Sequence, residues 1–215
     1  MKRLIKFLII LILFLLTYFI LFKIVELDKI IMKKIYPLKY SEYVEKYAKE
    51  YDVDKYLVYA IIKVESNFKE DAKSASDAIG LMQIMEATAF ETANKMGLYI
   101  SEKDLFNPEL NIKIGLKYFI SLLEKYNHNY NLAIIAYNAG IGNVDKWIQD
   151  GTIKEDGTDV ENVPFKETNN YVRKILRDYE IYKELYEHWA SGREVTKFHL
   201  IWNFCLRPSN WRNKY

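Results

Sequence analysis

The sequence predicts a mainly α-helical domain preceded by one membrane-spanning helix, and three observations lead to this prediction. Apolar residues in the body of the chain recur at three- and four-residue spacing, as in Leu57, Ala60 and Ile61, which is typical of helices with one buried face. Strand-like alternation is confined to short, ambiguous segments. Residues Phe7–Phe22 form an unbroken apolar run near the N-terminus.

The apolar run predicts a membrane anchor. Sixteen helical residues span roughly 24 Å, and apolar neighbours extend this length toward the ~30 Å hydrocarbon core. A cleaved signal peptide is the alternative, but KIVELDKI after the run lacks a small-x-small cleavage site. We expect residues 1–6 to be a cytoplasmic stub, 7–25 an uncleaved signal anchor and 26–40 a linker. Lysines on both sides of the run weaken the positive-inside rule, so orientation depends on function.

Helical segments are expected between residues 41 and 187, with a C-terminal tail of unknown role at 188–215. Ser41 and Asp54 are expected N-caps, and Pro108 follows Asn107 at another helix start. The expected helices cover about 41–53, 54–68, the later part of 80–97, 107–126, 129–140, 141–149 and 168–185.

Glu65 is the first candidate for chemistry. It follows Leu57 and Ile61 at four-residue spacing, so it projects from the buried face of its helix. A carboxylate there is costly without a partner, and the nearby helix C-terminus also disfavours negative charge. Both effects raise the pKa, which suits a general acid. The structural alternative is an ion pair between Glu65 and a neighbouring helix.

Four segments, in this order, resemble the lytic transglycosylases of the soluble-lytic-transglycosylase type, which belong to the lysozyme-like superfamily. They are Glu65-Ser66 in VESNF, Gly80–Gln83 in GLMQIMEATA, Ala136–Gly140 in AYNAG, and Glu167–Val172 in ETNNYV. The resemblance implies a lysozyme-like fold with a groove for peptidoglycan glycan strands.

The resemblance also implies a mechanism with Glu65 as the single catalytic residue. The acid protonates the oxygen between N-acetylmuramic acid and N-acetylglucosamine. The carboxylate then takes the proton of the muramyl C6 hydroxyl, which attacks C1 and gives a 1,6-anhydro product. Ordinary glycoside hydrolysis uses two carboxyl groups, with substrate-assisted exceptions.

The other motif residues are expected to bind substrate. Gln83 suits an acetamido group, Met82 a sugar face, and Tyr171 a hydrogen bond near the acid or the N-acetyl group. Glu167, at the start of the last helix, is expected to line the groove. The complete set of expected substrate-binding residues is Ser66, Ser76, Met82, Gln83, Tyr137, Asn138, Glu167 and Tyr171. Packing is the alternative role for the tyrosines and for Met82.

Two positions depart from the family pattern. Asp77 stands where the family usually has glycine before GLMQ, and Asp tolerates left-handed geometry better than most residues. Glu86 replaces a proline at a helix start. Neither departure removes the acid. Gly80 and Gly140 are expected to serve backbone geometry.

Three alternative functions remain open at this point. A goose-type-lysozyme-like muramidase would use water as nucleophile, held by a carboxylate such as Asp71 or Asp77. A non-catalytic peptidoglycan-binding scaffold would retain the groove alone. A soluble cytoplasmic helical domain with a misread anchor is the third.

Composition narrows the partners. The net charge of +2 argues against nucleic acid. No metal site and no cofactor are expected, because the histidines and the single cysteine lack ligand spacing; these residues are His128, His188, His199 and Cys205. The expected partners are peptidoglycan, the membrane and a cell-envelope assembly. The expected location is the cell membrane, with the domain on the extracytoplasmic side.

Overall fold

The computed structural model describes residues 2–188, except for the side chains of 2–4, 21–26 and 188. The chain divides into two compact units, with the boundary between Pro37 and Leu38. The expected tail, with His199 and Cys205, lies outside the described residues apart from its first position.

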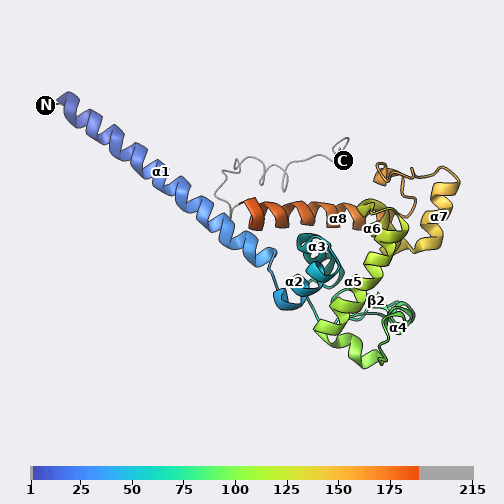
Figure 1. The fold of residues 1–215 in the computed structure, drawn as a ribbon. Helices are drawn as coiled ribbons and strands as arrows, with labels where there is room; N and C mark the ends of the chain where they lie inside the picture. Colours follow the sequence, from blue (N-terminus) through green and yellow to red (C-terminus); the bar gives the residue numbers. More distant parts are fainter. Residues whose placement is uncertain (1, 189–215) are drawn as a thin grey trace. The chain divides into compact units, whose positions relative to one another are not determined.

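The first unit is one continuous helix, α1 (Lys2–Ile35), drawn in blue in Figure 1. Its described apolar side chains are exposed except for the half-buried Met32, and the exposed ones include Phe7, Leu11 and Phe14. In the part of the chain that the structure describes, no helix meets the length and apolarity needed to cross a membrane.

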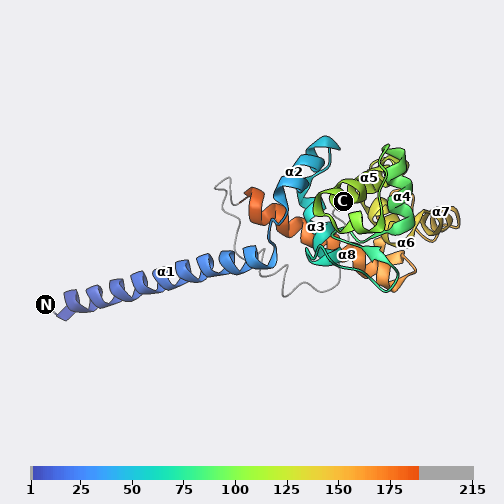
Figure 2. The same cartoon turned by 90° about the horizontal axis from the view of Figure 1, so that it is seen from below.

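In its described part, up to residue 188, the second unit contains seven α-helices (Figures 1 and 2). The helices are α2 (Ser41–Glu50), α3 (Lys55–Ser66), α4 (Glu86–Lys95), α5 (Pro108–Lys125), α6 (Tyr130–Ala139), α7 (Ile141–Gln149) and α8 (Lys166–Lys183). Short 3-10 turns occupy Glu102–Phe106 (η1) and Val160–Asn162 (η2), and a π turn, η3, covers Glu184–His188. The mainly helical architecture expected from the sequence is confirmed.

Helix α3 is the centre of this unit, because it packs against both α8 and α2. Residues Leu57–Ile62 are buried without interruption, so α3 is covered on nearly all sides over its first two turns. Helix α5 contacts α2, α4 and α6, and α6 in turn contacts α8. The C-terminal end of α3 therefore reaches the region where α6 and α8 also come together.

Local signals explain three of the helix starts, those of α3, α5 and α6, where a side chain caps the first turn. Asp54 caps α3 by accepting the Tyr56 backbone N–H at 2.8 Å, as predicted. Asn107 accepts the Leu110 N–H at 3.0 Å, and Pro108 takes the first helical position of α5. The predicted Ser41 cap is wrong, because Ser41 is already helical and the left-handed Tyr40 precedes it without a side-chain cap.

Two further expectations differ from the structure. Helix α8 begins at Lys166 rather than Thr168. A two-residue hairpin, which periodicity could not reveal, joins β1 (Ala78–Ile79) to β2 (Ile84–Met85) in antiparallel register, with Ile79 opposite Ile84. The loop of this hairpin, residues 80–83, is the GLMQ segment and is called here the 80–83 loop.

Candidate active site

Glu65 is the penultimate residue of α3, and the chain leaves the helix through Asn67, which has a left-handed φ of 49°. Its side chain is partly buried. Burial raises the pKa of Glu65 from 4.5 to about 7, against a hydrogen bond from Tyr171 that lowers it. Among residues 2–188 Glu65 makes no ion pair, so the structural alternative of a salt bridge with another helix is not what the fold contains.

Tyr171 is the closest polar partner of this carboxyl group. It comes from α8, and its hydroxyl donates a hydrogen bond to Glu65 Oε1 at 2.5 Å. Burial, together with the adjacent Glu65 charge, raises the pKa of Tyr171 well above 10. The phenol therefore stays protonated and remains a donor at any ordinary pH. The hydrogen bond near the acid that was expected of Tyr171 is present.

Tyr137 brings a second phenol, half-buried, to the site from α6. Its hydroxyl donates to the Met82 carbonyl oxygen at 2.8 Å, and its ring packs against Tyr118 and Phe119. Burial raises the pKa of Tyr137 well above 10, and the Glu65 charge adds to the effect. Two neutral phenols thus stand near one titratable carboxyl group.

The 80–83 loop is tied to α3 and α6 through successive carbonyl groups. The Ser66 hydroxyl donates a hydrogen bond to the Leu81 carbonyl oxygen at 2.8 Å. The next carbonyl oxygen, that of Met82, accepts the hydrogen bond from the Tyr137 hydroxyl. Gln83 has a left-handed φ of 45°, and its Nε2 donates to the carbonyl oxygens of Ala72 and Gly80. These hydrogen bonds hold the 80–83 loop next to Ser66, the residue that follows Glu65.

Two expected substrate contacts are placed differently by the structure. The Met82 side chain is fully buried, so it does not present an apolar surface to a sugar. Ser66 is also buried, and its hydroxyl contacts the carbonyl oxygens of Ile62 and Leu81. Both side chains therefore lie in the protein interior next to the site and do not face a substrate. For Met82 this is the packing role that the sequence analysis left open as the alternative.

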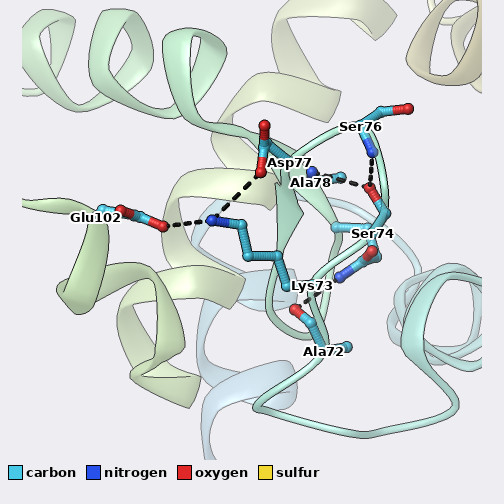
Figure 3. A network of polar contacts seen from close by, with 8 residues as sticks. Ala72, Lys73, Ser74, Ser76, Asp77, Ala78 and Glu102 are labelled. Atoms are coloured by element: carbon cyan, nitrogen blue, oxygen red, sulfur yellow. Dashed lines mark hydrogen bonds and ion pairs between the residues drawn. The ribbon is translucent and has the colours of Figure 1, made fainter.

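Ser76 lies on the exposed segment that precedes the 80–83 loop (Figure 3). Its backbone N–H donates to Ser74 Oγ at 3.2 Å, and its own hydroxyl points away from that contact. In the same network Lys73 bridges Asp77 at 3.3 Å and Glu102 at 2.7 Å. Asp77, one of the two carboxylates considered for holding the water molecule of a muramidase, is thus engaged in an ion pair.

Asn138 and Glu167 lie where the end of α6 meets the start of α8. Asn138 is exposed, and its Oδ1 accepts a hydrogen bond from the Thr168 hydroxyl at 2.7 Å. Thr168 is buried, while Glu167 is exposed in the first turn of α8. Sequence reasoning missed Thr168, although a small hydroxyl residue between two expected site residues was a usable signal.

Asn111 is the second residue that sequence reasoning missed. It is fully buried in α5, and its side chain accepts the Met82 backbone N–H at 2.8 Å. A polar residue immediately before the apolar Ile112, with Gly115 one turn later, was the signal in the sequence.

The assembled site offers proton transfer by one carboxyl group. A group with a pKa of about 7 can donate a proton to a leaving oxygen and then accept one near neutral pH. Within the described residues no cluster of three or more His, Cys, Asp or Glu could hold a metal ion.

Comparison with known proteins gives consistent matches. The sequence profile described as "Transglycosylase SLT domain" matches residues 42–159. The chain is 31% identical over 187 residues to a soluble lytic murein transglycosylase of Salmonella typhimurium, covering 86% of this chain and 27% of the relative. It is 39% identical over 118 residues to the membrane-bound lytic murein transglycosylase C of Edwardsiella ictaluri, covering 49% of this chain and 32% of that protein.

The fold has solved counterparts. The 70-kDa soluble lytic transglycosylase of Escherichia coli superposes with a TM-score of 0.66 at 29% identity, over 75% of this chain and 26% of the other. The chain spans about a quarter of the length of the first curated relatives that it matches.

Proposed function

The chain belongs to the SLT-domain transglycosylase family, and on that premise we propose that it is a membrane-anchored lytic transglycosylase. Its substrate is the β-1,4 bond between N-acetylmuramic acid and N-acetylglucosamine in peptidoglycan. Cleavage is non-hydrolytic and leaves 1,6-anhydromuramyl ends. The observation that carries the proposal is the carboxyl group of Glu65, with a pKa raised to about 7 and a buried phenol donor on Oε1.

Glu65 acts first as an acid. Its proton passes to the bridging oxygen, the bond from that oxygen to the muramyl C1 breaks, and the leaving sugar departs with a free hydroxyl. The substrate's own N-acetyl group stabilises the positive charge at C1. Because burial raises the pKa of Glu65 to about 7, a substantial fraction of the acid is protonated near neutral pH, so this step does not require an acidic medium.

Glu65 then acts as a base. The carboxylate left by the first step takes the proton of the muramyl C6 hydroxyl, and the C6 oxygen bonds to C1. Glu65 returns to its protonated form and no water is consumed. Tyr171 stabilises the carboxylate between the two steps, because a hydrogen bond to a charged acceptor is stronger than one to a neutral acceptor. The cycle therefore balances with one enzymic carboxyl group.

Three exposed or half-exposed side chains bind the glycan in this proposal. Gln83 uses its amide donor within the protein, which leaves its Oε1 for an acetamido N–H. Asn138 Oδ1 accepts a hydrogen bond from the Thr168 hydroxyl, which leaves the amide N–H₂ of Asn138 to donate to a sugar hydroxyl or carbonyl oxygen. Glu167, in the first turn of α8, accepts from sugar hydroxyls. We retain Ser76 and Tyr137 as groove-lining residues.

The membrane anchor is part of the proposal. It is supported by the run Phe7–Phe22, by the exposed apolar side chains of α1 and by relatives named membrane-bound. The test is alkaline carbonate extraction of membranes that contain the chain or its Leu11→Lys/Phe14→Lys variant. Retention of the unaltered chain and release of the variant support the anchor, because lysine at the bilayer centre is costly. Release of both contradicts it.

In this proposal the domain lies on the cell-wall side of the membrane, because its substrate is there, and an envelope assembly directs it. Replacement of residues 1–40 by an unrelated single-span anchor separates the two roles. If the protein with the unrelated anchor fully restores a strain that lacks the original protein, residues 1–40 serve only as a tether and no dedicated assembly partner recognises them.

The activity is tested by mass spectrometry of fragments released from purified sacculi by the full 215-residue chain in a non-ionic detergent. Glu65→Gln is the inactive variant and Glu124→Gln, an exposed substitution on α5, is its matched control. We expect anhydromuramyl ends from the unaltered chain and from the control, and none from Glu65→Gln. Reducing ends that depend on Glu65 would indicate a muramidase. Binding to sacculi without any release would indicate a scaffold.

A further inference from the structure

We propose that Asn111 and Gly115 on α5 form a seat for the 80–83 loop and so act as positioning residues for the acid at Glu65. This inference rests on the proposed function, since it concerns the same site. Neither residue contacts Glu65. Their effect passes through the backbone of Leu81 and Met82, which carries the hydrogen bonds of two side chains that adjoin the acid.

The first part of the seat is polar. Asn111 is fully buried and uses three hydrogen bonds to join three segments. Its Oδ1 accepts the Met82 N–H at 2.8 Å, and its Nδ2 donates to the carbonyl oxygens of Ile79 at 3.0 Å and Leu105 at 2.8 Å. These bonds join the end of β1 and the 80–83 loop to α5 and to the end of η1. A residue that merely filled space would not need this pattern.

The second part of the seat is a matter of shape. Gly115 lies one helical turn after Asn111, and a Cβ at this position would meet the Met82 Cβ and Sδ at 2.8 Å. The Met82 side chain therefore lies directly on the α5 backbone. On the loop side, a Cβ on Gly80 would clash with Asn111 Nδ2. Loop and helix fit each other only because both glycines lack side chains.

The seat connects to the acid in two ways. The Leu81 carbonyl accepts the hydroxyl of Ser66, the residue next to Glu65. The Met82 carbonyl accepts the hydroxyl of Tyr137, a phenol that feels the Glu65 charge. A loop that moved would release both donors and open the carboxyl group to water. Tyr171 from α8 and Tyr137 from α6 are the titratable groups that interact with Glu65.

The direct test compares Asn111→Ser with Asn107→Ala in the full chain. The shorter serine side chain would leave the Met82 N–H and the carbonyl groups of Ile79 and Leu105 without their partners, while water could fill the space. Asn107 caps the same helix one turn earlier and is exposed, so its loss weakens α5 without touching the loop. Turnover on sacculi, the pH dependence of kcat/KM, and hydrogen exchange at the Met82 amide are measured for both.

We expect Asn111→Ser to lower kcat by about tenfold or more, because small displacements at a reacting centre are costly. The alkaline limb of its pH profile should move to lower pH by about half a unit, because a wetter Glu65 is a stronger acid. The Met82 amide should exchange faster. Asn107→Ala should lower the melting temperature and change none of these. Asn111→Ser that behaves like Asn107→Ala overturns the proposal.

A second pair of variants tests the proposal if Asn111→Ser folds poorly. Gly115→Ala should lower kcat. The same substitution made in the Met82→Ala variant should lower kcat much less, because the new methyl group then has room. Purely additive losses contradict the seat. If the unaltered chain releases nothing from sacculi, the proposed function fails. The exchange of the Met82 amide and the NMR titration of the Glu65 carboxyl carbon still decide the positioning role.

Discussion

The hydroxyl of Tyr171 donates a hydrogen bond to Glu65 Oε1 at 2.5 Å, across 106 positions of sequence. Burial raises the pKa of the carboxyl group, and this hydrogen bond lowers it. The value of about 7 is therefore a balance between two effects. An acid that must give up a proton and then take one back is best served by such an intermediate value.

Removing the Tyr171 hydroxyl should raise the pKa of Glu65. In Tyr171→Phe the carboxylate loses its donor, so the pKa of Glu65 should rise. Since a hydrogen bond to a charged group is worth about 1.5–3 kcal/mol, the alkaline limb of kcat/KM should move up by about one to two pH units. The pH profile of turnover on sacculi measures this. Tyr179→Phe is the control, because Tyr179 donates from α8 to Asp54, at the other end of α3. An unmoved limb in Tyr171→Phe would show that the hydrogen bond does not tune the acid.

The same carboxyl group should make stability depend on pH. The pKa of Glu65 is raised in the folded chain, so the folded chain binds the proton more tightly than the unfolded chain does. This contribution is complete below about pH 4.5 and is lost as pH rises through about 7. With about 1.4 kcal/mol per pKa unit, its full size is on the order of 3 kcal/mol.

Glu65→Gln should accordingly be more stable than the unaltered chain at pH 8, with the advantage disappearing near pH 4.5. Urea unfolding at both pH values measures the free energy of unfolding of each protein. Glu124→Gln, which alters an exposed carboxyl group on α5, is measured beside it as the matched control. An advantage of equal size at pH 4.5 and pH 8 would refute the linkage to Glu65 ionisation.

Sequence reasoning predicted the features that depend on local chemistry. The Asp54 cap and the Asn107-Pro108 start are encoded within a few residues, and both are present. The buried face that carries Glu65 follows from helical periodicity. The contact between Tyr171 and Glu65 was expected only through resemblance, since no local rule relates residues so far apart.

The features that were missed depend on long-range contacts. The hairpin has two residues per strand, too few for alternation to be detectable, and it is held by Ser66 and Asn111 from outside. Met82 was expected to contact a sugar, with packing as the alternative, and the absence of a side chain at Gly115 lets it pack on α5. A glycine inside a helix can mark such a seat, and its meaning emerges only when the partner is known.

The contact between Thr168 and Asn138 should matter for binding more than for chemistry. Thr168→Val keeps the shape of the side chain and removes the hydroxyl that fixes Asn138 Oδ1. We expect KM for soluble glycan fragments to rise by about threefold to tenfold, because one hydrogen bond contributes about 1 kcal/mol, with kcat less affected. Thr168→Ser, which restores the hydroxyl, should recover the original KM. Equal losses in both variants would assign the effect to packing.

The two glycines with left-handed φ values on either side of α4 should respond differently to alanine. Gly80 has φ +74°, and its new Cβ would lie 2.5 Å from the Leu105 carbonyl oxygen and closer still to Asn111. Gly97 has φ +70° and open space around it. Gly97→Ala should therefore cost only backbone strain, about 1–2 kcal/mol, whereas Gly80→Ala adds a clash with buried groups and should cost about 3 kcal/mol or more. Urea unfolding of the two variants at one pH compares them directly. Similar losses would mean that the 80–83 loop can move away from α5 at little cost, and the loop could then no longer be regarded as a rigid wall of the site.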